Sequence, residues 1–261
     1  MNYVAGLDVG SLTAKIVVLG VTSKEPDLCY QKILRVGYNP ARIARQMLEE
    51  AESFIGQSFQ TVISTGYGRK LVENATRQVT EITCHATGAH YTNQNIRTII
   101  DIGGQDSKVI KINGQGKVQD FTMNEKCAAG TGRFIEVMAN ALEVDLENFG
   151  TIAIQSTNPT SISNTCTVFA ESEIISKINQ GISRIDVIAG ICQAIAKKIG
   201  TYAARVGIEP VVALTGGVAH NSGVRFMLEA QIKKTIEIPD SPGPQMIGAL
   251  GAALIAAKVG E

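Results

Sequence analysis

Residues 99–134 read IIDIGGQDSKVIKINGQGKVQDFTMNEKCAAGTGRF. An apolar run ends in Asp101, a glycine pair follows, and Lys108 opens a second apolar run. This pattern predicts a strand, a tight turn and a returning strand. The turn has the size that surrounds a phosphate group, so we expect it to face a nucleotide.

The same motif also occurs near the N-terminus. Asp8-Val9-Gly10 matches Asp101-Ile102-Gly103, and Lys15 follows Asp8 at the spacing at which Lys108 follows Asp101. The duplication predicts an α/β protein with two related lobes. We expect an N-terminal lobe at residues 1–94 and a C-terminal lobe at residues 95–242, with a small-residue helix at about 243–261 packing back on the first lobe.

The overall composition excludes several classes of partner. Lysine plus arginine equals aspartate plus glutamate at 24 each, so no global charge favours nucleic acid or an anionic membrane. No stretch approaches the roughly 20 apolar residues that cross a bilayer, and the chain starts without a basic leader. We therefore expect a cytoplasmic protein, and we do not expect disulfides among its five cysteines, an odd number without close pairs.

The first turn has the side chains of a phosphate site. The Gly10 backbone and the hydroxyls of Ser11 and Thr13 can surround phosphate oxygens, while Asp8 can hold Mg²⁺ through water and Lys15 adds positive charge. Taken alone, this stretch is equally compatible with a plain hairpin turn.

Two later glycine-rich stretches follow predicted strands. Residues 65–69 read TGYGR, which is compatible with a simple turn or with close approach to a ligand. Residues 215–221 read TGGVAHN, where the glycine pair lets the backbone approach a flat ligand.

The cysteines fall into two groups. Cys127 and Cys166 each precede a predicted helix, whose unpaired N–H groups stabilise a thiolate or an anionic cluster. Two partly buried structural thiols are the alternative. The remaining three are expected to pack in the core: Cys192 on a long helical stripe, Cys29 in a strand, and Cys84 beside His85 in a helix.

Several motifs of this sequence resemble those of a known protein family, and the resemblance spans essentially the whole chain. DVGSLTAK, DIGGQDSK, LTGGVAHN and IGALGAAL resemble the phosphate, adenosine and connecting motifs of the acetate kinase, sugar kinase, Hsp70 and actin ATPase superfamily. Within it, MNEKCAAGTGRF and SNTCTVFAESE are similar to the cysteine segments of the activator ATPases of 2-hydroxyacyl-CoA dehydratases. The ATPase subunits of benzoyl-CoA reductase belong to the same family.

The resemblance implies a homodimer in which Cys127 and Cys166 of both subunits ligate one [4Fe-4S] cluster. It implies ATP hydrolysis with Mg²⁺, ferredoxin or flavodoxin as electron donor, and a 2-hydroxyacyl-CoA dehydratase or related iron–sulfur enzyme as acceptor. Nucleic acid and membranes are not expected partners.

The resemblance also implies roles for individual residues. Asp8 and Asp101 would organise Mg²⁺ through water, and Gln105 would orient the attacking water. The other nucleotide-binding residues would be Gly10, Ser11, Thr13, Lys15, Gly103 and Gly104 at the phosphates, Gly216, Gly217 and Asn221 at the adenosine, and Gly132 and Glu136 on the same side.

Two other functions remain open from the sequence. A small-molecule kinase with the same ATP fold would use Asp101 or Asp106 as a base, and a nucleotide-dependent scaffold would bind without turnover. The kinase would leave Cys127 and Cys166 unexplained, and the intact Asp8, Asp101 and Gln105 do not favour the scaffold. Iron content separates both from the activator.

Overall fold

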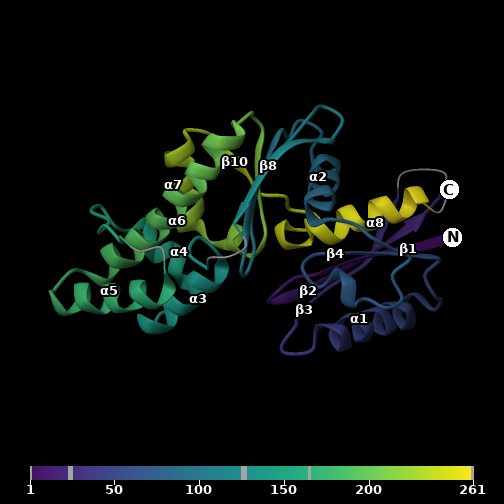
Figure 1. The fold of residues 1–261 in the computed structure, drawn as a ribbon, viewed down its shortest axis with the longest axis horizontal. Coiled ribbons are helices and arrows are strands. Elements are labelled where there is room, and N and C mark those ends of the chain that lie inside the picture. The colour runs from purple at the N-terminus through teal and green to yellow at the C-terminus, as the bar shows by residue number, and fades with distance from the viewer. Residues whose placement is uncertain (1, 23–25, 125–127, 164–165, 260–261) are drawn as a thin grey trace. The chain divides into compact units, whose positions relative to one another are not determined.

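The computed structural model describes residues 2–22, 26–124, 128–163 and 166–259. The chain divides into two compact units, each with its own five-stranded sheet (Figure 1). The first unit comprises Met1–Arg97, Ile112–Gln119 and Pro239–Glu261, and the second comprises Thr98–Lys111 and Asp120–Ile238.

The first unit is built on a sheet of order β3-β2-β1-β4-β5. Its strands are β1 (Asn2–Val9), β2 (Thr13–Val21), β3 (Asp27–Arg35), β4 (Thr61–Thr65) and β5 (Arg77–Gln78). The helices are α1 (Pro40–Ile55), α2 (Glu81–Thr92) and α8 (Ile247–Val259), with short 3₁₀ turns η1 (Arg69–Leu71) and η3 (Pro244–Met246). The predicted hairpin is confirmed as antiparallel β1 and β2, while β4 runs parallel to β1.

Helix α1 shows how local sequence sets an element's limits. The Asn39 side chain accepts a hydrogen bond from the Arg42 N–H at 3.0 Å, Pro40 occupies the first turn, and Gly56 ends the helix in the left-handed conformation. The apolar stripe packs against the sheet through four buried residues: Ala44, Met47, Leu48 and Ala51. The capping residue, the proline and the apolar stripe therefore account for both ends and the buried face of this helix.

Glycine residues allow the backbone of helix α8 to lie close to the backbone of its neighbours. It packs against α2 and against β1, β2 and β4. A Cβ added to Gly251 would lie 1.8 Å from the Cys84 carbonyl oxygen, and one added to Gly6 on β1 would lie 2.1 Å from the Ala249 carbonyl oxygen. These distances leave no room for a methyl group, because the obstructing atoms are backbone.

We therefore expect Gly251→Ala to destabilise the protein by about 3 kcal/mol, the upper end of the usual cost of overpacking. The melting temperature should fall by roughly 10 °C. Gly114→Ala is the matched control, since its new Cβ would meet only the end of the flexible Arg97 side chain at 3.3 Å. Thermal unfolding followed by circular dichroism measures both; equal melting temperatures would contradict the packing argument.

The second unit repeats the hairpin and adds a helical layer. Its sheet has the order β10-β9-β6-β7-β8. The strands are β6 (Thr98–Ile102), β7 (Ser107–Ile112), β8 (Val118–Asn124), β9 (Val212–Thr215) and β10 (Ile236–Glu237). The helices are α3 (Gly132–Ala141), α4 (Leu146–Ile154), α5 (Thr167–Asn179), α6 (Arg184–Val206) and α7 (Ser222–Ile232), with the 3₁₀ turn η2 (Gly217–His220).

The structure tests the prediction that Cys192 and Cys29 pack in the hydrophobic core. Cys192 on α6 is fully buried, and burial raises the pKa of its thiol to about 12, so its predicted place in the core is confirmed. The prediction for Cys29 is wrong: it is half-buried on β3, at the edge of the sheet, and its thiol donates to the Asp27 carbonyl oxygen. An edge strand has a neighbour on one side only, which the apolar flanks of Cys29 did not indicate.

In the part of the chain that the structure describes, no helix combines the length and apolar character needed to span a bilayer.

Candidate functional site

In the first unit, the β1–β2 hairpin places the predicted phosphate-binding residues around one turn. Asp8 pairs with Lys15 across the ladder, and their side chains approach to 3.2 Å between Asp8 Oδ2 and Lys15 Nζ. The Gly10 N–H donates to the Thr13 carbonyl oxygen at 3.0 Å, which closes the turn that also contains Ser11. The hairpin therefore carries a largely buried carboxylate and ammonium group at the base of a tight turn.

In the second unit, the β6–β7 hairpin reproduces this geometry. Asp101 pairs with Lys108, whose Nζ lies 3.1 Å from Asp101 Oδ2, and the Gly103 N–H donates to the Asp106 carbonyl oxygen at 3.0 Å. Lys108 Nζ also lies 2.8 Å from Asp106 Oδ2. The Lys108–Asp101 ion pair is more deeply buried than the Lys15–Asp8 ion pair of the first unit. Gln105, in the turn between β6 and β7, is exposed.

The duplication extends to a threonine in each unit, on the strand parallel to the one that carries the aspartate. Thr65 on β4 pairs with Asp8, and Thr215 on β9 pairs with Asp101. The glycines that follow, Gly66 and Gly216, both have positive φ, at 86° and 84°.

At these two glycines, the backbone lies close to the side chains of Asp8 and Asp101. A Cβ would lie 2.4 Å from Asp8 Oδ1 at Gly66, and 2.9 Å from Asp101 Oδ1 at Gly216. The TGYGR stretch is thus a close approach to the first aspartate as well as a turn. The repeated Thr-Gly after a buried strand was the signal that could have found it.

The two aspartates are nevertheless held differently. The Thr215 hydroxyl donates to Asp101 Oδ1 at 2.9 Å, so both carboxylate oxygens of Asp101 accept hydrogen bonds. Among the described residues, the buried Thr65 hydroxyl has no hydrogen-bond partner of good geometry and lies beside the Cys84 thiol. Burial raises the pKa of that thiol to about 12, which supports the packing role expected of Cys84.

The start of α3 is attached to the second turn. The N–H groups of Gly132 and Arg133 donate to the carbonyl oxygens of Gly103 and Gly104, both at 2.8 Å. The turn thus satisfies two of the N–H groups that a helix leaves unpaired at its N-terminus. Glu136 lies one turn further along α3 and forms an ion pair with Arg133 at 3.2 Å.

The structure gathers most of the predicted second-unit residues near Asp101, with one different local role. Gly217 opens the 3₁₀ turn η2, next to Gly216. The Asn221 side chain accepts the Val224 N–H at 2.9 Å and so caps α7. This capping bond fixes the orientation of the amide for which the family resemblance implies a place at the adenosine.

The cysteines predicted to hold a cluster are described only in part. Cys166 is exposed and is the N-cap residue of α5, at the helix start where it was expected. Cys127 lies outside the described residues, and α3 begins at Gly132 rather than directly after this cysteine. Among the described residues, no three His, Cys, Asp or Glu side chains are grouped so that they could hold a metal ion.

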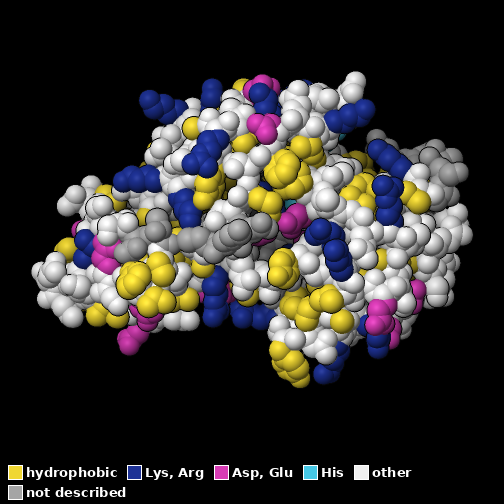
Figure 2. All heavy atoms as spheres, in the orientation of Figure 1, with side chains coloured by type: hydrophobic (Ala, Val, Ile, Leu, Met, Phe, Trp, Pro, Cys, Tyr) yellow, Lys and Arg dark blue, Asp and Glu magenta, His cyan; other side chains and the backbone are white. Residues whose placement is uncertain are grey.

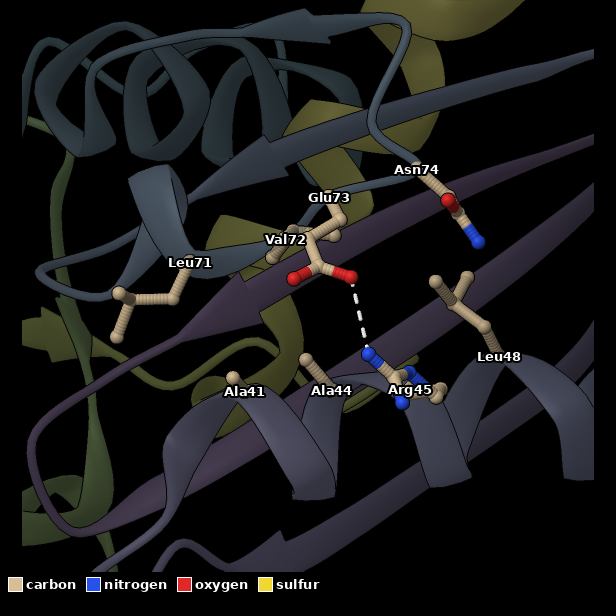
Figure 3. A pocket seen from close by; sticks show the side chains of 8 residues that line it. All are labelled: Ala41, Ala44, Arg45, Leu48, Leu71, Val72, Glu73 and Asn74. Atoms are coloured by element: carbon tan, nitrogen blue, oxygen red, sulfur yellow. Dashed lines mark hydrogen bonds and ion pairs between the residues drawn. The ribbon is translucent and has the colours of Figure 1, made fainter.

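A surface pocket on the first unit is unrelated to these residues. Figure 3 shows it between α1 and the chain that follows η1, with an Arg45–Glu73 ion pair across it at 2.9 Å. Both partners are well exposed, so this ion pair contributes little to stability. None of the predicted site residues lines the pocket.

Comparison with known proteins identifies close relatives over the whole chain. The chain is 45% identical to an (R)-2-hydroxyglutaryl-CoA dehydratase activating ATPase of Acidaminococcus fermentans, covering 98% of this chain and 97% of that protein. It is 41% identical to a 2-hydroxyisocaproyl-CoA dehydratase activator of Clostridioides difficile, covering 97% and 94%. A component of the benzoyl-CoA reductase of Thauera aromatica is 31% identical, covering 97% and 93%.

Solved structures give the same result. The activator of the 2-hydroxyisocaproyl-CoA dehydratase from Clostridium difficile with bound ADPNP matches with a TM-score of 0.89 at 41% identity, covering 98% of this chain and 95% of that one. The ethanolamine utilization protein EutJ from Carboxydothermus hydrogenoformans, at 18% identity and a TM-score of 0.62, shares the fold. The model of the BadF/BadG/BcrA/BcrD ATPase family matches residues 5–256, and the chain therefore belongs to this ATPase family.

Proposed function

We propose that this ATPase uses ATP hydrolysis to pass a low-potential electron from ferredoxin or flavodoxin to a 2-hydroxyacyl-CoA dehydratase or a related iron–sulfur enzyme. The observation that carries the proposal is Cys166, an exposed cysteine at the start of α5, in a chain whose relatives are named as dehydratase activators. A [4Fe-4S] cluster, when bound, would supply the one-electron chemistry.

The surroundings of Cys166 fit an anionic cluster shared by two copies of the chain. The N–H groups at the start of α5 would stabilise a nearby negative charge, and Cys127 and Cys166 from two chains would supply the four thiolates that such a cluster requires. Val168 and Phe169, two and three positions after Cys166, are 68% and 65% exposed. Hydrophobic side chains are visible at the surface where α5 lies (Figure 2). A homodimer would bury them, which supports the shared arrangement.

In this proposal, Asp8 and Asp101 hold Mg²⁺ through water, and the two hairpin turns bind phosphates. Because Lys108 and Thr215 already occupy the Asp101 oxygens, water-mediated contact fits this carboxylate better than direct ligation. Gln105, exposed on the second turn, orients the attacking water. The ADPNP-bound relative supports a nucleotide site in this fold.

A physical link between nucleotide and cluster follows from the bonds at α3. Since Gly132 and Arg133 donate to the carbonyl oxygens of the second turn, movement of that turn on nucleotide binding would displace the start of α3. The segment containing Cys127 precedes this helix in the chain. Differential binding of ATP to two positions of the turn would therefore couple hydrolysis to the cluster environment.

The direct test is ATP-dependent reduction of a purified dehydratase under anaerobic conditions. We expect electron delivery to require the reduced donor and hydrolysable ATP, and to stop after replacement of ATP by ADPNP. Phosphate transfer to a small hydroxylated substrate would indicate the kinase, and nucleotide binding without turnover would indicate the scaffold. Either result would contradict the proposal.

A further inference from the structure

We propose that Glu173 is a positioning residue for Cys166. The Ser163 N–H donates to Glu173 Oε1 at 3.0 Å and to Oε2 at 3.2 Å, and the Ser163 hydroxyl donates to Oε2 at 2.8 Å. We call these bonds the Glu173 clasp. The assigned role rests on the cluster of the proposed function, whereas the clasp itself is present without it.

The clasp joins Ser163, three positions before Cys166, to α5. On the C-terminal side, the Cys166 carbonyl oxygen accepts the Ala170 N–H at 2.9 Å and so belongs to the first turn of α5. Glu173 stands further along the same helix and reaches back to Ser163, three positions before the cysteine. The chain is therefore anchored to α5 both before and after the candidate ligand.

The charge of Glu173 is supported locally. Lys177, one turn further along α5, has its Nζ 3.7 Å from Glu173 Oε1, with the acidic residue on the N-terminal side as the more favourable order. An ionised carboxylate accepts from both the amide and the hydroxyl of Ser163, and bonds to a charged acceptor are the stronger kind. Residues that orient a metal ligand in this way commonly change metal affinity by 10- to 100-fold.

Helix α5 provides a matched control in Glu171. It lies two positions before Glu173 and therefore on a different side of the helix. Glu171→Gln and Glu173→Gln remove the same charge from the same helix, but only the second replaces one acceptor oxygen of the clasp with an amide NH₂ group. Ser163→Ala breaks the hydroxyl bond from the opposite side and serves if Glu173→Gln does not fold.

The first measurement uses the full chain without iron. Amide hydrogen exchange at Ser163 should become about tenfold faster in Glu173→Gln, because one neutral carbonyl oxygen then replaces the two carboxylate oxygens that accept this N–H, and should stay at the wild-type rate in Glu171→Gln. Unchanged exchange in Glu173→Gln would overturn the clasp and the inference together.

The second measurement uses the iron-loaded protein and follows loss of the visible cluster absorption to a strong iron chelator. We expect loss to be about tenfold faster in Glu173→Gln and in Ser163→Ala than in wild type, with Glu171→Gln unchanged. Equal rates in all four proteins would overturn the role of Glu173 and leave the proposed function standing. Absence of iron from wild type would overturn the proposed function, and with it that role, whatever the exchange result.

Discussion

Replacing Cys166 with alanine is expected to abolish the cluster. The cysteine is exposed at the start of α5, where helix N–H groups stabilise an anionic cluster, and loss of one ligand per chain leaves a two-fold site with two of its four thiolates. Wild type purified anaerobically should contain about four irons per dimer, and the variant essentially none. Iron analysis and the visible spectrum measure both. Cys127→Ala should behave in the same way.

Two other cysteines provide the controls. Cys192→Ala should keep the full iron content and lower only the melting temperature, because the side chain is buried in the α6 stripe. Cys29→Ala, on the edge strand β3, should change neither quantity. Four irons in every monomer, or an unchanged spectrum in Cys166→Ala, would contradict a cluster shared by two chains.

The elements that the sequence predicts correctly are those set by local patterns. The β1–β2 and β6–β7 hairpins follow from apolar runs around a glycine turn, and α1 follows from Pro40 and an apolar stripe. The parallel pairing of β4 with β1, and of β9 with β6, joins segments far apart in the chain. For this reason the contacts of Gly66 with Asp8 and of Thr215 with Asp101 do not follow from residue spacing, although the repeated Thr-Gly after a buried strand is a sequence signal for them.

Three further positions could not be predicted for a related reason: the periodicity of a sequence does not show which helix face or which strand packs against a neighbouring element. Cys29 has apolar flanks but lies on an edge strand. Ile175 is apolar and follows the buried Ile174 on α5, yet it is 46% exposed, because adjacent residues of a helix face different sides. Glu173 contacts Ser163, ten positions earlier, and no periodic pattern in the sequence indicates this contact. Tertiary packing decides all three positions.

Replacing Gln105 with alanine is expected to slow ATP hydrolysis by about 10- to 1000-fold, the scale of losing one group that positions a reactant. Gln105 is exposed on the turn whose carbonyl oxygens hold α3, so its side chain is available to a nucleotide without contributing to the core. A neutral amide can orient water without competing with the aspartates for Mg²⁺. Nucleotide affinity and iron content should therefore stay at wild-type values.

Gln115→Ala is the matched control, because Gln115 is also an exposed glutamine in a hairpin turn, the one between β7 and β8. Phosphate release and reduction of the dehydratase are to be measured side by side in wild type and both variants. Since hydrolysis and electron delivery are coupled in the proposed function, both rates should fall by the same factor in Gln105→Ala and by none in Gln115→Ala. A full rate of hydrolysis in Gln105→Ala would remove this residue from the mechanism. Sustained electron delivery without hydrolysis would mean that ATP acts only as a structural ligand, because the free energy of ATP hydrolysis would then not drive repeated electron transfer.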